Sequence, residues 1–278
     1  MYCLRKIREK ASSVLITIFL FVLIITLPTT MTTTTTTINR VYGQQPDQMD
    51  LLNTTDSSAN IQNMTVKKVH VGDIDIAYKM FGKGDPIILF NGASDNMDAW
   101  DPSFLAGISS NHTVIVFDQR GIANTTAGSK PYTIEQLAND TAGLLDALKI
   151  PKADVMGYSL GSWIAEQLTM MYPDKVNSLV LVGSSCGGKD SIPKPPEFLK
   201  LQSDVVNKSL SNIPLTAEDI KSLVSASLGS GWIKLHPESL EGFENITSLQ
   251  QLKPGLPPEI ANNQNNVGHA WTATNWSG

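Results

Sequence analysis

The sequence predicts an α/β fold: a mostly parallel sheet with helices on both faces and a helical region inserted late in the chain. Two observations support this prediction. Between residues 66 and 188, short apolar β-rich segments alternate with segments of helical periodicity, which is typical of a parallel sheet. Two of those segments, residues 87–90 and 114–117, are continuously apolar, as expected for strands that are buried on both faces.

The N-terminal 43 residues have the pattern of a targeting segment. A basic stretch from Arg5 to Lys10 precedes an apolar run from Val14 to Leu27, and no charged residue occurs between positions 11 and 38. We interpret residues 1–43 as a signal peptide or an N-terminal membrane anchor, and the sequence leaves both open. Either one places the remainder outside the cytoplasm, secreted or anchored to the membrane by this segment alone.

Residues 44–65 are polar and lack apolar periodicity, so we expect a disordered spacer. Sequons for N-glycosylation suit an extracellular glycoprotein, although a chain this rich in Asn, Ser and Thr also contains sequons by chance. They begin at Asn53, Asn63, Asn111, Asn124, Asn139, Asn207, Asn245 and Asn275.

The core is expected over residues 66–188. Its first two strands, residues 66–71 and 74–81, pair as a hairpin across Gly72-Asp73. The remaining elements are strands at 86–90, 113–117, 154–157 and 178–183, and helices at 134–148 and 160–172. From residue 189 the strand signal disappears, and helical stretches at 196–208, 216–228, 237–249 and 258–271 predict a cap over residues 189–278.

A five-residue motif joins one of these strands to the helix that follows it. Gly157-Tyr158-Ser159-Leu160-Gly161 matches G-x-S-x-G, in which the glycines permit a sharp turn that lifts the serine hydroxyl above the sheet. Residues 183–187 match the same pattern, but they lead into a proline-rich segment instead of a helix. We therefore choose Ser159, and not Ser185, as the nucleophile.

Further motifs follow one another in the order found in one superfamily. They are Ile76-Ala77-Tyr78, Phe81-Gly82, Asn91-Gly92, Asp118-Gln119-Arg120-Gly121, the G-x-S-x-G turn, Tyr172-Pro173-Asp174-Lys175-Val176 and Leu179-Val180-Leu181. With them the chain resembles the α/β-hydrolase superfamily over residues 74–188. It is most similar to small esterases, enol-lactonases, proline-iminopeptidase-like enzymes and cofactor-free haloperoxidases, and the residues do not separate these branches.

The resemblance implies an oxyanion hole made of two backbone N–H groups, those of Ala93 and Leu160. Such donors stabilise the negative charge of a tetrahedral intermediate, and the loss of one typically costs about 3–4 kcal/mol. This sequence departs from the superfamily where the usual His-Gly is Asn91-Gly92. We expect Asp118, Arg120 and Gly121 to fix the loop geometry.

The same resemblance implies an acid and a histidine after Ser159, each following a strand beyond the cap. The sequence ends at Gly278 before either strand, so we expect an apparently truncated hydrolase that lacks the last two strands and leaves strand 178–183 as an open edge. Asp190 is a weak substitute for the acid, and His236 and His269 are weak substitutes for the base. His70 and His112 precede Ser159 and are interpreted as structural.

Three functional interpretations follow. The first is a serine hydrolase acting on an ester, lactone, amide or related small acyl substrate, inactive as the truncated chain. The second is a non-catalytic extracytoplasmic binding protein or remnant that keeps the fold, and the third is a rewired site that uses a cap histidine. The net charge of −5 argues against nucleic-acid binding. No metal-ligand or phosphate-loop motif occurs, so no cofactor or metal is expected, and the oligomeric state stays open.

Overall fold

A computed structural model of the protein describes residues 61, 63–185, 195–211, 213 and 215–228, with short pieces at 15–18, 234–236, 259–260, 263–264 and 266–267. These residues belong to two compact units. The first contains the sheet and the pieces at 263–264 and 266–267, and the second contains two cap helices.

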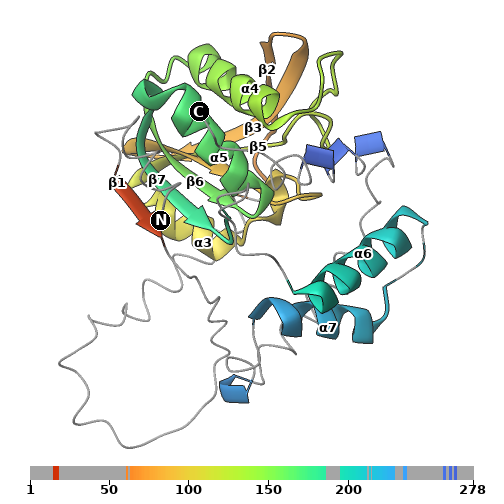
Figure 1. Ribbon diagram of the computed structural model, residues 1–278. Coiled ribbons are helices and arrows are strands. Elements are labelled where there is room, and N and C mark those ends of the chain that lie inside the picture. The colour runs from red at the N-terminus through yellow and green to blue at the C-terminus, as the bar shows by residue number, and fades with distance from the viewer. Residues whose placement is uncertain are drawn as a thin grey trace, which may run out of the picture. The chain divides into compact units, whose positions relative to one another are not determined.

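The first unit is built on a seven-stranded sheet with the order β1-β7-β6-β4-β5-β3-β2 (Figure 1). β2 and β3 pair antiparallel as the expected hairpin, β3 also pairs antiparallel with β5, and the remaining pairs are parallel. The strands are β1 (Leu15–Ile18), β2 (Lys67–Val71), β3 (Ile74–Gly82), β4 (Asp85–Phe90), β5 (His112–Phe117), β6 (Ala153–Tyr158) and β7 (Val176–Val182).

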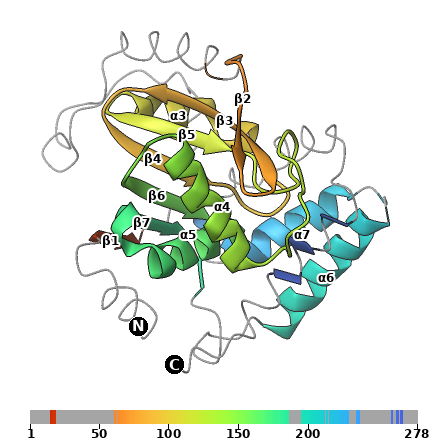
Figure 2. The same ribbon diagram turned by 90° about the horizontal axis from the view of Figure 1, so that it is seen from above.

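Helices cover both faces of this sheet, as Figure 2 shows from above. They are α3 (Pro102–Ser109), α4 (Ile134–Ala147) and α5 (Leu160–Met171), with 3-10 turns η1 (Met97–Ala99) and η2 (Pro173–Lys175). Alternate residues of a strand point to opposite faces. Thus Ile88 and Phe90 pack in the core under α4 and α5, whereas Ile87 and Leu89 pack in the core under α3.

Helix α3 was not predicted from the sequence, because it is only eight residues long and contains Gly107. Its start does carry a local signal. The Asp101 side chain accepts hydrogen bonds from the N–H groups of Ser103 and Phe104, both at 2.9 Å, and Pro102 occupies the first turn. Aspartate as the N-cap followed by proline is a typical helix start.

The edge expected beside β7 is not open. Leu15–Ile18, the only described residues of the predicted leader, pair in parallel with Ser178–Leu181 of β7. The apolar run thus supplies the backbone groups that β7 otherwise lacks on this side, which corrects the expectation of an open edge. Within the part of the chain that the structure describes, no helix is long and apolar enough to cross a membrane.

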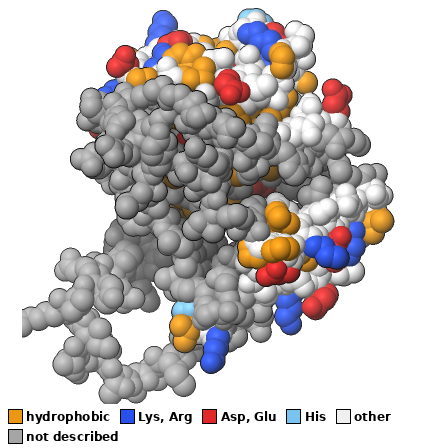
Figure 3. All heavy atoms as spheres, in the orientation of Figure 1, with side chains coloured by type: hydrophobic (Ala, Val, Ile, Leu, Met, Phe, Trp, Pro, Cys, Tyr) orange, Lys and Arg blue, Asp and Glu red, His pale blue; other side chains and the backbone are white. Residues whose placement is uncertain are grey.

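The second unit contains the predicted cap helices α6 (Pro196–Leu210) and α7 (Ala217–Leu228). Lys208 of α6 and Asp219 of α7 form an ion pair at 2.6 Å. The helix expected at 237–249 lies outside the described residues, and the described pieces of 258–271 are helical. Figure 3 shows acidic and basic side chains interspersed on the described part of one face.

Candidate active site

Ser159 lies in the strained turn between β6 and α5. Its backbone has φ 52° and ψ −119°, a left-handed conformation that a residue other than glycine rarely adopts. Ser159 occupies the N-cap position of α5, but its hydroxyl makes no capping hydrogen bond. The hydroxyl is therefore not engaged by the helix that it precedes.

The two glycines of the motif allow close backbone approaches. A Cβ atom on Gly157 would lie 2.4 Å from the carbonyl oxygen of Gly161, and one on Gly161 would lie 2.4 Å from the carbonyl oxygen of Phe90. Side chains at either position would push the start of α5 away from the ends of β6 and β4. The sequence motif is thus a packing requirement at the carboxyl edge of the sheet.

Hydrogen bonds tie the turn to β7. The N–H of Ser159 donates to the carbonyl of Val182 at 2.9 Å. The single proton of the buried Ser162 hydroxyl is shared between the carbonyls of Gly157 and Val182, at 2.7 and 2.9 Å. These bonds hold the strained Ser159 backbone between two central strands.

The loop that carries Ala93 follows β4 and is held by amide side chains. Asn91 is buried and donates its side-chain N–H to the carbonyl of Asn96. Gln119 donates to the carbonyl of Asn91 at 2.9 Å. Asn91 thus replaces the histidine usual at this position and closes the loop through its own amide.

Leu160 and the Ala93 loop lie near one another because of Gly161. A Cβ atom on Gly161 would lie 2.6 Å from the carbonyl oxygen of Asn91, two residues before Ala93. The first N–H groups of a helix have no intrahelical acceptor, so the Leu160 N–H at the start of α5 is free of the helix ladder. The start of α5, with the Leu160 N–H, therefore lies next to the Ala93 loop.

Asp118 and Arg120 fix neighbouring loops, as expected from the sequence. Asp118 accepts hydrogen bonds from the N–H groups of Met97 and Asn124, at 2.8 and 3.0 Å. Burial raises the pKa of Asp118, although these donors favour its charged form. The buried guanidinium of Arg120 pairs with Asp140 at 2.7 Å and with Asp73 at 2.8 Å.

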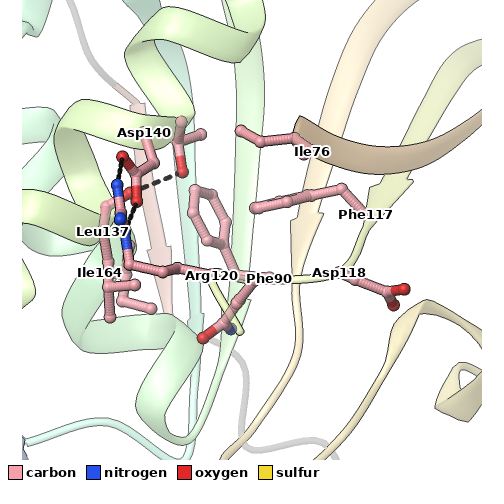
Figure 4. A pocket seen from close by; sticks show the side chains of 10 residues that line it. Ile76, Phe90, Phe117, Asp118, Arg120, Leu137, Asp140 and Ile164 are labelled. Atoms are coloured by element: carbon pink, nitrogen blue, oxygen red, sulfur yellow. Dashed lines mark hydrogen bonds and ion pairs between the residues drawn. The ribbon is translucent and has the colours of Figure 1, made fainter. Parts of the chain in front are cut away.

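A small cavity adjoins this ion pair (Figure 4). It is lined by side chains of the core that include Phe90, Phe117 and Ile164, together with Arg120 and Asp140, and its volume is about 10 Å³. That is room for about one water molecule. The cavity is consequently too small to be a substrate pocket.

The described histidines of the first unit do not reach Ser159. His70 pairs with Asp75 at 2.8 Å on the β2–β3 hairpin. His112 begins β5 at the amino edge of the sheet, roughly 20 Å from the turn at about 3.3 Å per residue. His236 is half-buried in the second unit, and Asp190 and His269 lie outside the described residues.

Sequence reasoning missed two residues beside the site. Tyr158 is 48% exposed although it precedes the nucleophile, and its ring lies over Gly92, with Cδ1 3.2 Å from the place of a Cβ there. An aromatic at the second position of the motif is a signal that could have been used. Gln264 accepts a hydrogen bond from the N–H of Ser94, and no local pattern indicates this contact.

Comparison with known proteins agrees with this geometry. A family model described as alpha/beta hydrolase fold matches residues 85–230. The 3-oxoadipate enol-lactonase 2 of Acinetobacter baylyi is 30% identical over 115 residues, which are 41% of this chain and 43% of that protein. The poly(3-hydroxyalkanoate) depolymerase of Ectopseudomonas oleovorans is 32% identical over 114 residues, 41% of this chain and 40% of that protein.

Among solved structures, an alpha/beta hydrolase fold protein from Chitinophaga pinensis has a TM-score of 0.59 at 19% identity, with 78% of this chain and 75% of that one covered. The aligned part of the chain spans about two fifths of the curated relatives. The family match covers more than half of the 278 residues, and the chain belongs to the alpha/beta hydrolase family.

Proposed function

We propose that the protein is a serine hydrolase that transfers the acyl group of a small ester, lactone, amide or related substrate to Ser159. The observation that carries the proposal is the strained backbone of Ser159, at φ 52°, with a hydroxyl that does not cap α5. Strain of this kind persists only where the surrounding structure maintains it, and it occurs preferentially at functional sites.

The proposed reaction follows from the groups around the turn. The Ser159 Oγ attacks the acyl carbon and loses its proton to a base, while the carbonyl oxygen becomes an oxyanion. The N–H groups of Ala93 and Leu160 stabilise that oxyanion. Collapse of the intermediate expels the alcohol or amine, which takes up the proton, and water then hydrolyses the acyl-serine.

The base and its orienting acid are not among the described residues near Ser159. A serine hydroxyl without a base is a weak nucleophile, so we propose that turnover is slow or absent unless residues outside the described part supply the base. This absence also favours the second candidate, a non-catalytic binding protein that retains the fold. Relatives named as a lactonase and a depolymerase of a polyester support an oxygen ester as the substrate of the first candidate.

We also propose a cellular location for the protein. The basic and apolar pattern of residues 1–43 supports a location outside the cytoplasm. The pairing of Leu15–Ile18 with β7 does not fit a membrane-spanning role for the same residues. The name of the enol-lactonase supports a small-molecule substrate.

Ester hydrolysis with an added base tests the proposed chemistry. The chain is incubated with p-nitrophenyl butyrate, with and without imidazole as an external base. We expect a slow rate without imidazole, because an oxyanion hole and binding alone can leave about 10³–10⁴-fold catalysis over water. Imidazole should raise the part of the rate that depends on Ser159.

The variants decide between the candidates. Ser159→Ala should remove the imidazole-stimulated rate above the buffer reaction. Ser185→Ala, in the second G-x-S-x-G match, should keep it. A rate that is the same in the parent and in Ser159→Ala at every imidazole concentration favours the binding protein.

A further inference from the structure

Gln264 reaches the loop of the predicted oxyanion hole from a distant part of the chain. Its Oε1 accepts a hydrogen bond from the N–H of Ser94 at 2.7 Å, across 170 residues of sequence. Its side chain is 3% exposed, and Val267, three residues later, packs into the core under α4 and α5. The contact therefore joins two parts of the first unit.

The orientation of the Gln264 amide follows from its partner. The Ser94 N–H is a donor, so the atom that faces it must be the oxygen, and a flipped amide would place two donors together. The nitrogen Nε2 then points elsewhere, and it has no hydrogen-bond partner of normal geometry among the described residues. The buried hydroxyl of Tyr132 likewise has no hydrogen-bond partner of normal geometry among the described residues.

Tyr132 and Gln264 are close enough to influence one another. Burial raises the pKa of Tyr132 to about 12, and the nearby Gln264 side chain partly opposes this rise. Gln264 thus lies between the Ser94 loop and the segment that precedes α4.

The contact matters because of its place in the loop. Ser94 directly follows Ala93 and has φ 69°, a conformation disfavoured for serine. A hydrogen bond to the Ser94 N–H fixes the peptide plane between Ala93 and Ser94. That plane sets the ψ angle of Ala93 and thereby restrains the adjoining Gly92–Ala93 peptide, which carries the Ala93 N–H.

We propose that Gln264 is a positioning residue for the oxyanion loop, acting through Ser94 on the Ala93 donor. This inference rests on the proposed function, since it assigns Gln264 to the same site. Gln264 touches no reacting atom in this role. Its amide holds the strained loop in the conformation that the oxyanion requires, without adding a charge.

Two substitutions separate the hydrogen bond from the charge. Gln264→Leu removes the acceptor. Gln264→Glu keeps an acceptor of the same shape but adds a negative charge near the place where the oxyanion forms. The matched controls are Gln167→Leu and Gln167→Glu, at a half-buried position of α5.

The first readout is amide hydrogen exchange at Ser94, which needs no turnover. Removal of the acceptor should speed Ser94 exchange about tenfold or more in Gln264→Leu, while Gln264→Glu and both controls stay near the parent rate. An unchanged Ser94 exchange rate in Gln264→Leu would overturn the proposal. The melting temperature of each variant shows whether a change is local.

The second readout is the Ser159-dependent hydrolysis of p-nitrophenyl butyrate with imidazole. In Gln264→Leu, kcat should fall about tenfold or more with KM nearly unchanged, because the lost interaction serves the transition state. In Gln264→Glu the rate relative to the parent at the same pH should be about tenfold lower when the carboxylate is charged, and the ratio should return toward one as the pH falls and the carboxylate is protonated. A merely structural role would not produce this pH profile.

Failure of the inference and failure of the proposed function differ in these data. A Ser159-dependent rate that is the same in the parent and both Gln264 variants overturns the positioning role and leaves the nucleophile intact. A parent rate equal to that of Ser159→Ala contradicts the proposed function instead. Ser94 exchange then decides alone whether Gln264 holds the loop.

Discussion

Replacing Arg120 by methionine is expected to lower the free energy of unfolding by about 3–5 kcal/mol, because it removes one partner of a buried ion-pair network. The Arg120 side chain is 1% exposed and bonds to both oxygens of Asp140 and of Asp73. Methionine fills much of the same volume but leaves two carboxylates without a cation. Denaturant unfolding of the two proteins at neutral pH measures the difference.

The pH dependence gives a second measure of the same network. Hydrogen bonds from Arg120 hold the pKa of Asp73 well below its ordinary value of 3.8. A lowered pKa stabilises the folded state above the unfolded pKa, and this contribution is lost as the pH falls below about 4. The stability difference between the parent and Arg120→Met should therefore shrink below pH 4.

An exposed ion pair provides the control for Arg120. Lys200 and Asp204 are four residues apart on α6, and both side chains are largely exposed. Lys200→Met should change the stability little, because exposed pairs are screened by solvent. Equal effects of Lys200→Met and Arg120→Met would contradict the structural role of the buried network.

Replacing Gly161 by alanine should damage both the fold and the site. The new Cβ would lie 2.4 Å from the carbonyl oxygen of Phe90 and 2.6 Å from that of Asn91, and backbone atoms cannot yield as a flexible side chain does. We expect a loss of about 1–3 kcal/mol or more in stability, the range for overpacking in a core. The start of α5 should also move away from the Ala93 loop.

Activity and stability together test this expectation. Movement of the Leu160 N–H away from the Ala93 N–H should remove most of the Ser159-dependent ester hydrolysis, by about 10²-fold or more. Gly107→Ala on α3 is the matched control, since a Cβ there meets no atom within 4 Å. It should leave activity unchanged and stabilise slightly, because alanine favours a helix over glycine by about 1 kcal/mol. Parent-like activity in Gly161→Ala would show that the close approach is not needed.

Local sequence patterns predicted most of the sheet and its covering helices. The segments expected at 113–117 and 160–172, for example, are observed as β5 and α5 with bounds that differ by one residue. The apolar periodicity and the glycines of the G-x-S-x-G turn are enough to predict these elements, because each depends on backbone geometry within a few residues.

The contacts that local patterns do not encode were missed. The pairing of Leu15–Ile18 with β7 joins segments more than 150 residues apart, and its apolar pattern suits a leader equally well. The hydrogen bond between Ser94 and Gln264 joins a backbone N–H to a side-chain oxygen, and these two atoms meet only after folding. The bonds of Arg120 to Asp73 and Asp140 likewise span 47 and 20 residues.

The strained turn should present Ser159 as the acyl-accepting nucleophile. The most direct test is to treat the folded chain with a fluorophosphonate in the presence of imidazole and to map the adduct by peptide mass spectrometry. We expect a slow adduct on Ser159 that disappears when the chain is first unfolded and is absent from Ser159→Ala. An adduct on Ser185 or another residue, or no adduct on Ser159 in the folded chain, would contradict it.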